Sequence, residues 1–317
     1  MRIIFLGTPG SMLYNFGAGM LRTHGDSKTP LMIMSICDLV NVILNLIFVI
    51  VFKMTVDGVA YATIISKYIS AAWVLLILFD PKGEYKLSVK ELRLSAKPCM
   101  NIIKVGVPCG INAMVFSLSN IVIQSSVNTF GATIIAGNSV ANNVTALSYQ
   151  FPSAIYSANI SFAGQCYGAG KFDRIEKLAI RSAILATVAT TLMSLLFTIV
   201  PAPFLGLFSS DPEVLSAAVP KLLIVSWSYL IYGTAEAILG ILRGLKRTTI
   251  PTIINMICVC GMRVLWVLFI FPLAPTQPVL LYLSYPATYI MDLVAVLIYF
   301  LHTRKIERAR TLKHQNA

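Results

Sequence analysis

The sequence predicts an all-α, polytopic membrane protein. Three observations lead to this prediction: an apolar composition, apolar segments of membrane-spanning length, and basic residues that gather between those segments. Of the 317 residues, 57% are hydrophobic and only 12% are charged, and the mean hydropathy is +0.78. Such a chain has too few polar side chains to cover a water-facing domain. Its long apolar runs also lack the period-two alternation of a membrane β-barrel. Lipid is therefore the expected solvent for most of its surface.

Apolar segments bounded by Pro, Gly or charge recur nine times along the chain. A helix that crosses about 30 Å of hydrocarbon needs roughly 20 residues, and each segment is close to this length. We therefore expect nine transmembrane helices, at 3–21, 31–52, 58–79, 100–127, 133–160, 178–200, 217–241, 251–272 and 279–301.

Basic residues occupy every second connection between these segments, which hold 19 of the 25 Lys and Arg residues. An excess of Lys and Arg marks the cytoplasmic side of a membrane. The pattern predicts a multi-pass protein of the plasma (inner) membrane with a cytoplasmic C-terminus. It also accounts for the net charge of +12 without nucleic acid, which would need one soluble basic face. The basic connections are 22–28, 82–97, 171–181, 243–247 and 304–313.

An internal repeat relates the opening segments to the closing ones. A shift of 221 residues places the G-x-L-R stretch at Gly19, and the later Pro30, on the same stretch at Gly240 and on Pro251. The segments between 100 and 200 have no counterpart at the front, and nine spans place the N-terminus outside. We interpret both facts as two six-helix halves that lack the first three helices. The predicted domains are a partial N-lobe of three helices (1–80), a basic cytoplasmic linker (81–98), a six-helix C-lobe (99–303) and a cytoplasmic tail (304–317).

Six short stretches follow one another along the chain: G-x-L-R-T-H-G-D-S-K-T-P at 19–30, D-G-V-A-Y-A-T at 57–63, G-x-P at 106–108, G-Q-x-Y-G-A-G-K at 164–171, L-F-S-S-D-P-E-V at 207–214 and L-R-G-x-K-R-T-T-x-P at 242–251. In this order they resemble the multidrug and toxic compound extrusion (MATE) transporters, with the chain similar to helices four to twelve of that family.

The resemblance implies a 6+6 plan of two lobes around a central cavity. It implies secondary active efflux by alternating access, in which drugs or other organic cations leave in exchange for protons or sodium. The expected partners are small organic cations or drugs and the lipid bilayer. No cofactor beyond the coupling ion, H⁺ or Na⁺, and no obligate protein partner is expected.

Ionisable side chains inside a bilayer are costly, so they usually face a protein interior or water and serve a function. Glu236 lies seven residues before Arg243, which places it about 10 Å inside the cytoplasmic boundary. The MATE resemblance implies an acidic residue there, facing the cavity of the C-lobe. Glu236 is therefore a candidate site for a proton or another cation. The alternative is a structural ion pair with Lys104, at similar depth.

Three further buried charges have a functional and a structural interpretation. Arg263 and Asp292 have matching depths on adjacent antiparallel helices, which favours a structural salt bridge between them. Asp38, with Asn41 and Asn45 at helical spacing, forms a polar face that could meet a coupling cation. A buried helix contact through the asparagines explains the same face equally well.

Polar residues also line one face of two later segments. Asn138, Asn142, Thr145 and Tyr149 recur at helical spacing and favour the lining of a cavity, with helix contact as the alternative. Tyr149 and other tyrosines could stack on a flat cationic drug, or simply pack. The preceding segment carries a less regular polar face, formed by Asn112, Asn120 and Gln124.

Catalytic motifs are not found in the sequence, which predicts that the chain is not an enzyme. His24, His302 and His314 lie in basic connections and cannot form a common metal site by spacing, and the six cysteines show no metal-ligand spacing. Neither a P-loop nor a G-x-S-x-G elbow is present. Two alternatives to efflux remain: a lipid-linked oligosaccharide flippase, which needs several cations in its cavity, and a fragment that does not transport.

Overall fold

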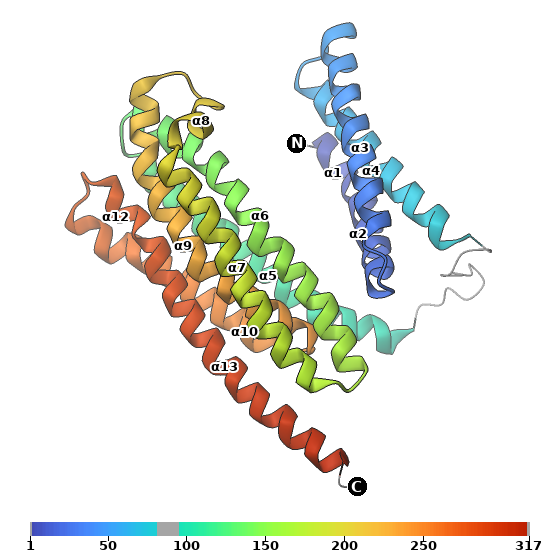
Figure 1. Cartoon of the computed structure of the whole chain (residues 1–317). Coiled ribbons are helices and arrows are strands. Elements are labelled where there is room, and N and C mark those ends of the chain that lie inside the picture. Colours follow the sequence, from blue (N-terminus) through green and yellow to red (C-terminus); the bar gives the residue numbers. More distant parts are fainter. Residues whose placement is uncertain (1, 81–94, 316–317) are drawn as a thin grey trace. The chain divides into compact units, whose positions relative to one another are not determined.

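The computed structural model describes residues 2–80 and 95–315, and every regular element among them is helical (Figure 1). The predicted all-α class is thus confirmed. Within these residues, seven helical segments are long and apolar enough to cross a bilayer, so the predicted count of nine is not confirmed. Of the remaining long helices, α2 (Thr8–Thr23) has only 16 residues, and α6 (Ala132–Gly168) is long enough but carries a polar face.

The chain divides into two compact units, Met1–Ser95 and Ala96–Ala317. The C-terminal unit begins with helix α5 (Ala96–Val127), three residues before the predicted boundary at 99, and the assignment of the two units to the lobes of a two-lobe plan stays a prediction. Most of the predicted linker, residues 81–94, lies outside the described residues. Each unit is described separately below.

The N-terminal unit consists of α1 (Arg2–Leu6), α2, α3 (Lys28–Leu46) with a π-helical end at Ile47–Val51, and α4 (Val56–Leu78). Its core joins α2, α3 and α4 through buried side chains that include Leu21, Ile33 and Val74. The Tyr14 hydroxyl of α2 donates a 2.8 Å hydrogen bond to the carbonyl of Pro30 in α3. This bond and the apolar core fix the entry of α3 against α2.

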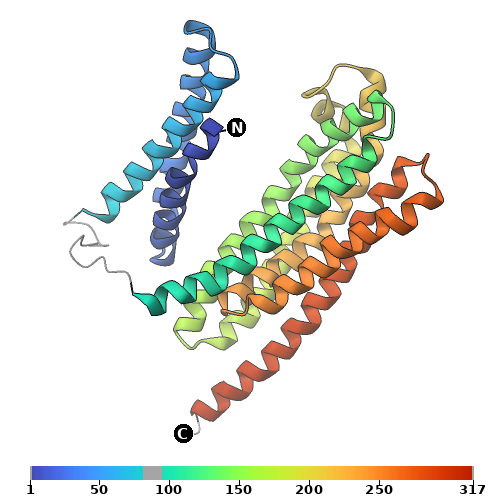
Figure 2. The same ribbon diagram turned by 180° about the vertical axis from the view of Figure 1, so that it is seen from behind.

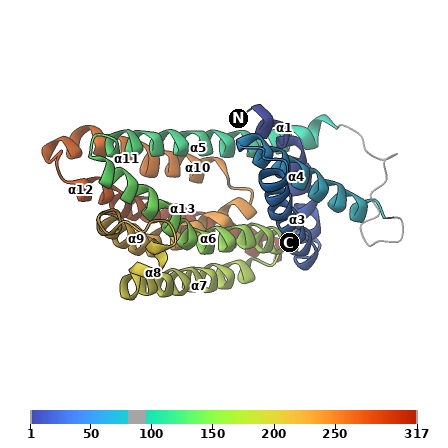
Figure 3. The ribbon, with the colours of Figure 1, turned by 90° about the horizontal axis from the view of Figure 1, so that it is seen from above.

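The C-terminal unit is a larger bundle built around α9 (Pro212–Gly244), with α6, α7 (Phe172–Ile199) and α13 (Ser284–Gln315) packed against it. Seen from above in Figure 3, α6, α9 and α13 lie between α7 on one side and α5 and α10 (Thr249–Asn255) on the other. Figure 2 shows α5 running along the outside of the bundle, beside the orange segment that begins with α10. Two short helices, α8 (Pro201–Gly206) and α12 (Pro278–Tyr282), complete the unit.

Helix α10 continues as one helical segment through alternating α and π turns. The order is π-helix Met256–Gly261, α11 (Met262–Leu265), π-helix Trp266–Ile270 and a short 3₁₀ turn at Phe271–Leu273. Wide π turns are rare and often occur near functional sites. Here they flank the single α turn that carries Arg263.

Glycines allow α6 and α9 to approach closely. A Cβ atom on Gly240 would lie 2.6 Å from the carbonyl oxygen of Tyr156, and one on Gly244 would lie 2.8 Å from that of Ile160. Small residues at such positions bring helix backbones together and increase their van der Waals contact, the main source of helix association in lipid. The α6–α9 pair is therefore the rigid frame on which the polar side chains of the unit are held.

The structure of the two units reproduces the predicted repeat. Helices α3 and α10 begin at Lys28 and Thr249, which are 221 residues apart, and each begins two residues before the shared proline. The turn before each helix contains one residue with positive φ at the same relative position, Gly25 (94°) and Lys246 (60°). The repeat is therefore a repeat of backbone conformation as well as of sequence letters.

The cytoplasmic tail predicted from residue 304 is helical at its start, and its side of the membrane stays a prediction. Helix α13 continues without interruption past residue 304 to Gln315. At this point the Arg304 guanidinium donates two hydrogen bonds, of 2.7 and 2.8 Å, to the carboxylate of Glu176 in α7. The ion pair attaches the helix to the bundle beyond the predicted end of the C-lobe.

Candidate functional site

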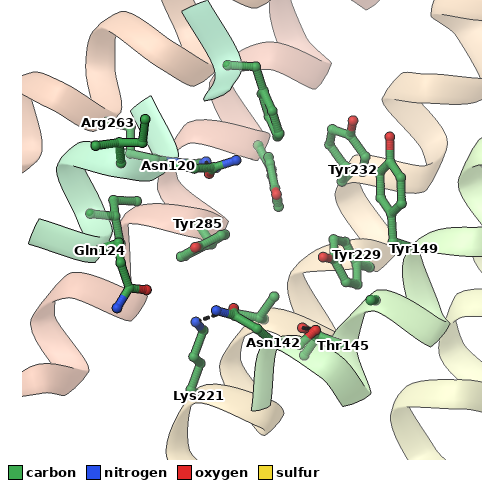
Figure 4. A pocket seen from close by; sticks show the side chains of 16 residues that line it. Asn120, Gln124, Asn142, Thr145, Tyr149, Lys221, Tyr229, Tyr232, Arg263 and Tyr285 are labelled. Carbon is green, nitrogen blue, oxygen red and sulfur yellow. Dashed lines mark hydrogen bonds between the residues drawn. The ribbon is translucent and has the colours of Figure 1, made fainter. Parts of the chain in front are cut away.

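A cavity of about 490 Å³ lies within the C-terminal unit, between α5, α6, α9, α11 and α13. Its lining combines aromatic rings, amides and two cations. Figure 4 shows Arg263 beside Asn120 at one end, Lys221 at another, and Tyr149, Tyr229 and Tyr232 along one side. Neither aspartate nor glutamate is among the residues that line it.

Lys221 reaches the cavity from α9. The helix begins at Pro212 and is capped by Asp211, whose carboxylate accepts a 2.9 Å hydrogen bond from the backbone N–H of Glu213. Lys221 is therefore well inside the helix, and it is 2% exposed. Its ammonium group donates to the side-chain oxygens of Asn138, at 2.6 Å, and Asn142, at 2.5 Å, both on α6.

The guanidinium of Arg263 is fully buried, at 0% exposure. It lies over the ring of Tyr285 at 4.4 Å and near the rings of Tyr289 at 5.5 Å and Phe116 at 5.9 Å. Its Nη1 atom donates a long hydrogen bond of 3.4 Å to Asn120, whereas Nε and Nη2 have no hydrogen-bond partner. Aromatic faces attract a cation but do not accept its hydrogen bonds as an oxygen does.

Tyrosines form a layer along one side of the cavity. The ring centroids of Tyr232 and Tyr289 are 4.6 Å apart, and Tyr149 stacks on Tyr232 at 6.0 Å and lies 6.2 Å from Tyr229. Offset and tilted aromatic pairs at these distances are favourable. The layer joins α6, α9 and α13, and it leaves flat ring faces at the cavity.

Glu236 lies behind this layer and does not line the cavity. It is 9% exposed, and its carboxylate accepts a 2.7 Å hydrogen bond from the hydroxyl of Tyr232, one helical turn earlier. Because the ring of Tyr232 lines the cavity while its hydroxyl reaches Glu236, this one side chain connects the two. Farther along α9, Arg243 donates a hydrogen bond to the hydroxyl of Tyr156 on α6.

The two predicted ion pairs are not formed within the described residues. Asp292 is 2% exposed and accepts hydrogen bonds of 3.4 Å from the side chain of Asn255, while Arg263 faces Asn120 and the tyrosines of α13. Asp292 faces Asn255, which lies eight residues before Arg263 in the same helical segment, so the two charges lie at different levels of the bundle. Lys104 is exposed on the surface of α5, and Glu236 bonds to Tyr232 instead.

The predicted polar faces of two helices converge on the cavity. Asn142, Thr145 and Tyr149 of α6 line it, as do Asn120 and Gln124 of α5. Asn138 lies just outside the lining, where its amide nitrogen donates a 3.0 Å hydrogen bond to Gln124 and its oxygen accepts from Lys221. Asn112 is half-buried farther along α5 and does not line the cavity. A substrate role for these residues stays a prediction.

Sequence reasoning missed Lys221 and the aromatic residues that surround Arg263. Lys221 lies just inside the predicted segment 217–241, and the Asp211–Pro212 cap signals an earlier helix start that places it deeper in the helix. Tyr282, Tyr285 and Tyr289 recur at spacings of three and four, which places them on one face of a helix. That spacing could have indicated an aromatic wall opposite Arg263.

Asp38 belongs to a second cavity, of about 240 Å³, in the N-terminal unit. Lys67 and Asn41 also line it, and Asn41 donates a 3.3 Å hydrogen bond to Ser66 and accepts one of 3.1 Å from Asn45. Asp38 is exposed at the surface of the unit, and it forms no ion pair with Lys67. The asparagine face is thus both a helix contact and a cavity wall.

A bundle of apolar helices around a buried polar cavity defines a multi-pass membrane protein of the solute-transporter class. The model of the MatE family matches residues 1–47 and 108–268 of this chain. The chain therefore belongs to the MATE family, and this membership points to a transporter and not to an enzyme.

Related proteins and structures agree with this assignment. The chain is 28% identical over 309 residues to the probable multidrug resistance protein YoeA of Bacillus subtilis (strain 168), covering 94% of this chain and 66% of that protein. It is 24% identical over 269 residues to the probable multidrug resistance protein NorM of Thermotoga maritima, covering 83% of this chain and 57% of that protein. The fold matches a crystal structure of a MATE protein in the bent conformation with a TM-score of 0.86 at 17% identity, over 98% of this chain and 69% of that one.

Proposed function

We propose that the chain provides the working part of a secondary active efflux antiporter in the plasma membrane, with its C-terminus in the cytoplasm. It exports drugs or other small organic compounds in exchange for protons or sodium by alternating access between two lobes. Its similarity to multidrug resistance proteins supports export of drugs, although the chain spans only 66% and 57% of the lengths of the two relatives above.

The contact between Tyr232 and Glu236 carries the proposal. An ion-driven exporter needs a site for the coupling ion that senses whether substrate is present. Glu236 is a buried carboxyl group without a cationic partner within ion-pair distance, and its hydrogen-bond donor is a side chain that lines the cavity. This arrangement supports exchange of a proton, or of sodium, at Glu236.

The exchange step follows from the hydrogen-bonding rules of a carboxyl group. As a carboxylate, Glu236 only accepts, so it holds the hydroxyl of Tyr232. When Glu236 takes up a proton it gains a donor of its own, and the bond to Tyr232 loses its charge-assisted strength. The tyrosine layer is then free to repack, which changes the wall against which a substrate rests.

Transport by the purified chain in proteoliposomes tests the proposal. Dye movement across the vesicle membrane is measured with a proton gradient and a sodium gradient imposed separately. We expect one gradient to drive dye movement, and Glu236→Gln to lower the gradient-dependent rate by about tenfold or more, the range for loss of a positioned proton-transfer group. Glu213→Gln, an exposed carboxylate at the start of the same helix, is the matched control and keeps the rate.

Two results would count against the proposal. If neither gradient moved dye through the folded wild-type chain, the antiport function would be rejected for this chain. If Glu236→Gln behaved like Glu213→Gln, Glu236 would be removed from the coupling mechanism.

A lipid-linked oligosaccharide flippase is the second candidate, because it needs cations in its cavity to hold a pyrophosphate group. Two cations, Lys221 and Arg263, do line the cavity. The same vesicles distinguish the candidates: a flippase would move a pyrophosphate-linked lipid between leaflets without an imposed ion gradient and would leave the soluble dye in place.

A further inference from the structure

The charge of the cavity in the C-terminal unit differs from what an organic cation requires. Two positively charged side chains line it, and no carboxylate does. Each cation is at most 2% exposed, and among the described residues neither has a carboxylate within ion-pair distance. A cationic ligand entering this space would meet two basic groups and no carboxylate to balance its charge, in a medium of low dielectric constant where repulsion between like charges is strong.

Both cations also have unused hydrogen-bond donors. An ammonium group has three N–H bonds, and Lys221 uses two of them on Asn138 and Asn142. A guanidinium has five, and Arg263 uses one of them in a long bond to Asn120, while its buried Nε and Nη2 atoms have no partner. Buried polar groups in proteins are nearly always satisfied, so these free donors indicate a site for an acceptor that the protein does not supply.

Lys221 and Arg263 are held in place by different contacts, and in both cases these contacts do not neutralise the side chain. The oxygens of Asn138 and Asn142 fix the position of Lys221 without neutralising it. The rings of Tyr285, Tyr289 and Phe116 hold Arg263 in the same way. The planar fork of a guanidinium suits the two oxygens of a carboxylate, phosphate or sulfonate, and an ammonium group suits a single oxygen.

We propose that this cavity binds organic anions that contain an aromatic ring. Acidic groups of the ligand, such as a carboxylate, phosphate or sulfonate, accept hydrogen bonds from Arg263 at one end of the cavity and from Lys221 at the other. The ring of the ligand lies against Tyr149 and Tyr229, whose faces line the same space. The inference rests on the proposed function only in taking this cavity as the substrate site of the exporter.

Two dyes that share a xanthene ring system and have opposite charge test the ligand class. Binding of the anion fluorescein and of the cation rhodamine 6G to the purified chain in a neutral detergent is followed by fluorescence anisotropy, without any ion gradient. We expect fluorescein to bind at least about tenfold more tightly than rhodamine 6G. Lys221→Met and Arg263→Met should each weaken fluorescein about tenfold or more, as expected when one of two buried charged contacts is lost.

Matched variants separate the effect of charge from that of folding. Lys104→Met removes an exposed cation of the same unit and keeps fluorescein binding unchanged. Lys221→Arg and Arg263→Lys keep the charge and retain binding better than the methionine variants. Circular dichroism and size-exclusion profiles identify any variant that does not fold, and the charge-conserving pair then decides the outcome.

Three results would overturn the inference: equal or tighter binding of rhodamine 6G, fluorescein binding that survives both methionine substitutions, or displacement of fluorescein by phosphatidylglycerol as effective as displacement by an aromatic carboxylate. The last would identify the ligand as an anionic lipid headgroup and not an aromatic anion. Binding needs no gradient, so the two proposals can fail separately. Anion binding without transport would leave this inference standing and reject only the proposed antiport. Transport of rhodamine 6G alone would support the antiport and reject the binding of organic anions.

Discussion

The two copies of the internal repeat share their backbone but not their polar chemistry. Both copies have a positive φ at the turn, a proline in the first turn of the next helix, and π-helical turns within that helix. Yet the buried charges of the second copy have apolar or neutral counterparts in the first: Val42 stands 221 residues before Arg263, Ala71 before Asp292, and Asn15 before Glu236. The shared features build the helices, and the differing residues give the C-terminal unit its site.

The exposure of the charged side chains also differs between the two copies of the repeat. Arg263, Asp292 and Glu236 are at most 9% exposed, whereas Asp38, the carboxylate in the cavity of the N-terminal unit, is exposed on its surface. A buried charge needs neighbouring groups that hold it in place. In the second copy, Asn120 and the tyrosines do this for Arg263, and Asn255 does it for Asp292. The comparison teaches that the repeat predicts architecture, and that the site must be found among the positions where the copies differ.

Substitution of the shared glycine is expected to have the largest effect and to separate the copies. In Gly240→Ala the new Cβ would lie 2.6 Å from the backbone oxygen of Tyr156, so α6 and α9 must move apart. We expect a loss of about 1–3 kcal/mol of stability, as for an overpacked core, measured by thermal unfolding in detergent. Its counterpart Gly19→Ala has no atom within 4 Å of the new Cβ.

Gly19→Ala should therefore be neutral or stabilise by up to about 1 kcal/mol, because alanine favours helix more than glycine does. Equal destabilisation by both substitutions would contradict the view that only the second copy depends on a close α6–α9 contact.

Local spacing predicted much of this molecule. The apolar runs gave the all-α class, and the spacing of Asn142, Thr145 and Tyr149 gave a polar face that the structure places at the cavity. Glu236 lies eight residues before the end of α9 at Gly244, near the helix end expected at Arg243, and its depth in the membrane stays a prediction. These features depend on residues within a few turns of one another, so the sequence contains them directly.

Features that depend on contacts between distant residues could not be predicted in this way. The predicted Arg263–Asp292 pair does not form because side-chain direction is set by the neighbours, Asn120 for one residue and Asn255 for the other. Lys221 was missed because Pro220 lies inside a helix that other contacts hold together. Its partners, Asn138 and Asn142, are 83 and 79 residues away in the sequence.

Substitution of Arg263 is the second test of the comparison, and here we expect the stability of the protein to rise instead of fall. Replacing a buried charged group with an apolar residue of similar volume is often neutral or stabilising by about 1–4 kcal/mol, and Arg263 has donors without partners. We expect Arg263→Met to raise the unfolding temperature of the ligand-free protein while it weakens binding of fluorescein about tenfold or more. Part of the gain is offset by loss of the cation–π contacts with Tyr285 and Tyr289, worth about 1–2 kcal/mol.

Lys104→Met, at an exposed position, should leave the unfolding temperature of the protein unchanged. A fall in the unfolding temperature of Arg263→Met would mean that the guanidinium stabilises the bundle. Arg263 would then be a structural residue of the second copy and not a group that awaits a ligand.

Tyr232→Phe should have the smallest effect on stability and the most specific effect on function. It removes only the hydroxyl that donates to Glu236, and the ring remains to line the cavity. Loss of one hydrogen bond to a charged group costs about 1.5–3 kcal/mol if the partner stays buried and charged, and less if Glu236 takes up a proton instead. We expect the second outcome, so the unfolding temperature falls little, while the pH dependence of gradient-driven dye movement changes.

The counterpart in the first copy, Ser11→Ala, removes a hydroxyl that bonds only to Gly7 of its own helix region and should change neither quantity. An unchanged pH dependence in Tyr232→Phe, with Glu236→Gln still inactive, would show that Glu236 exchanges its proton without the tyrosine layer, and the coupling path between ion and substrate would have to run elsewhere.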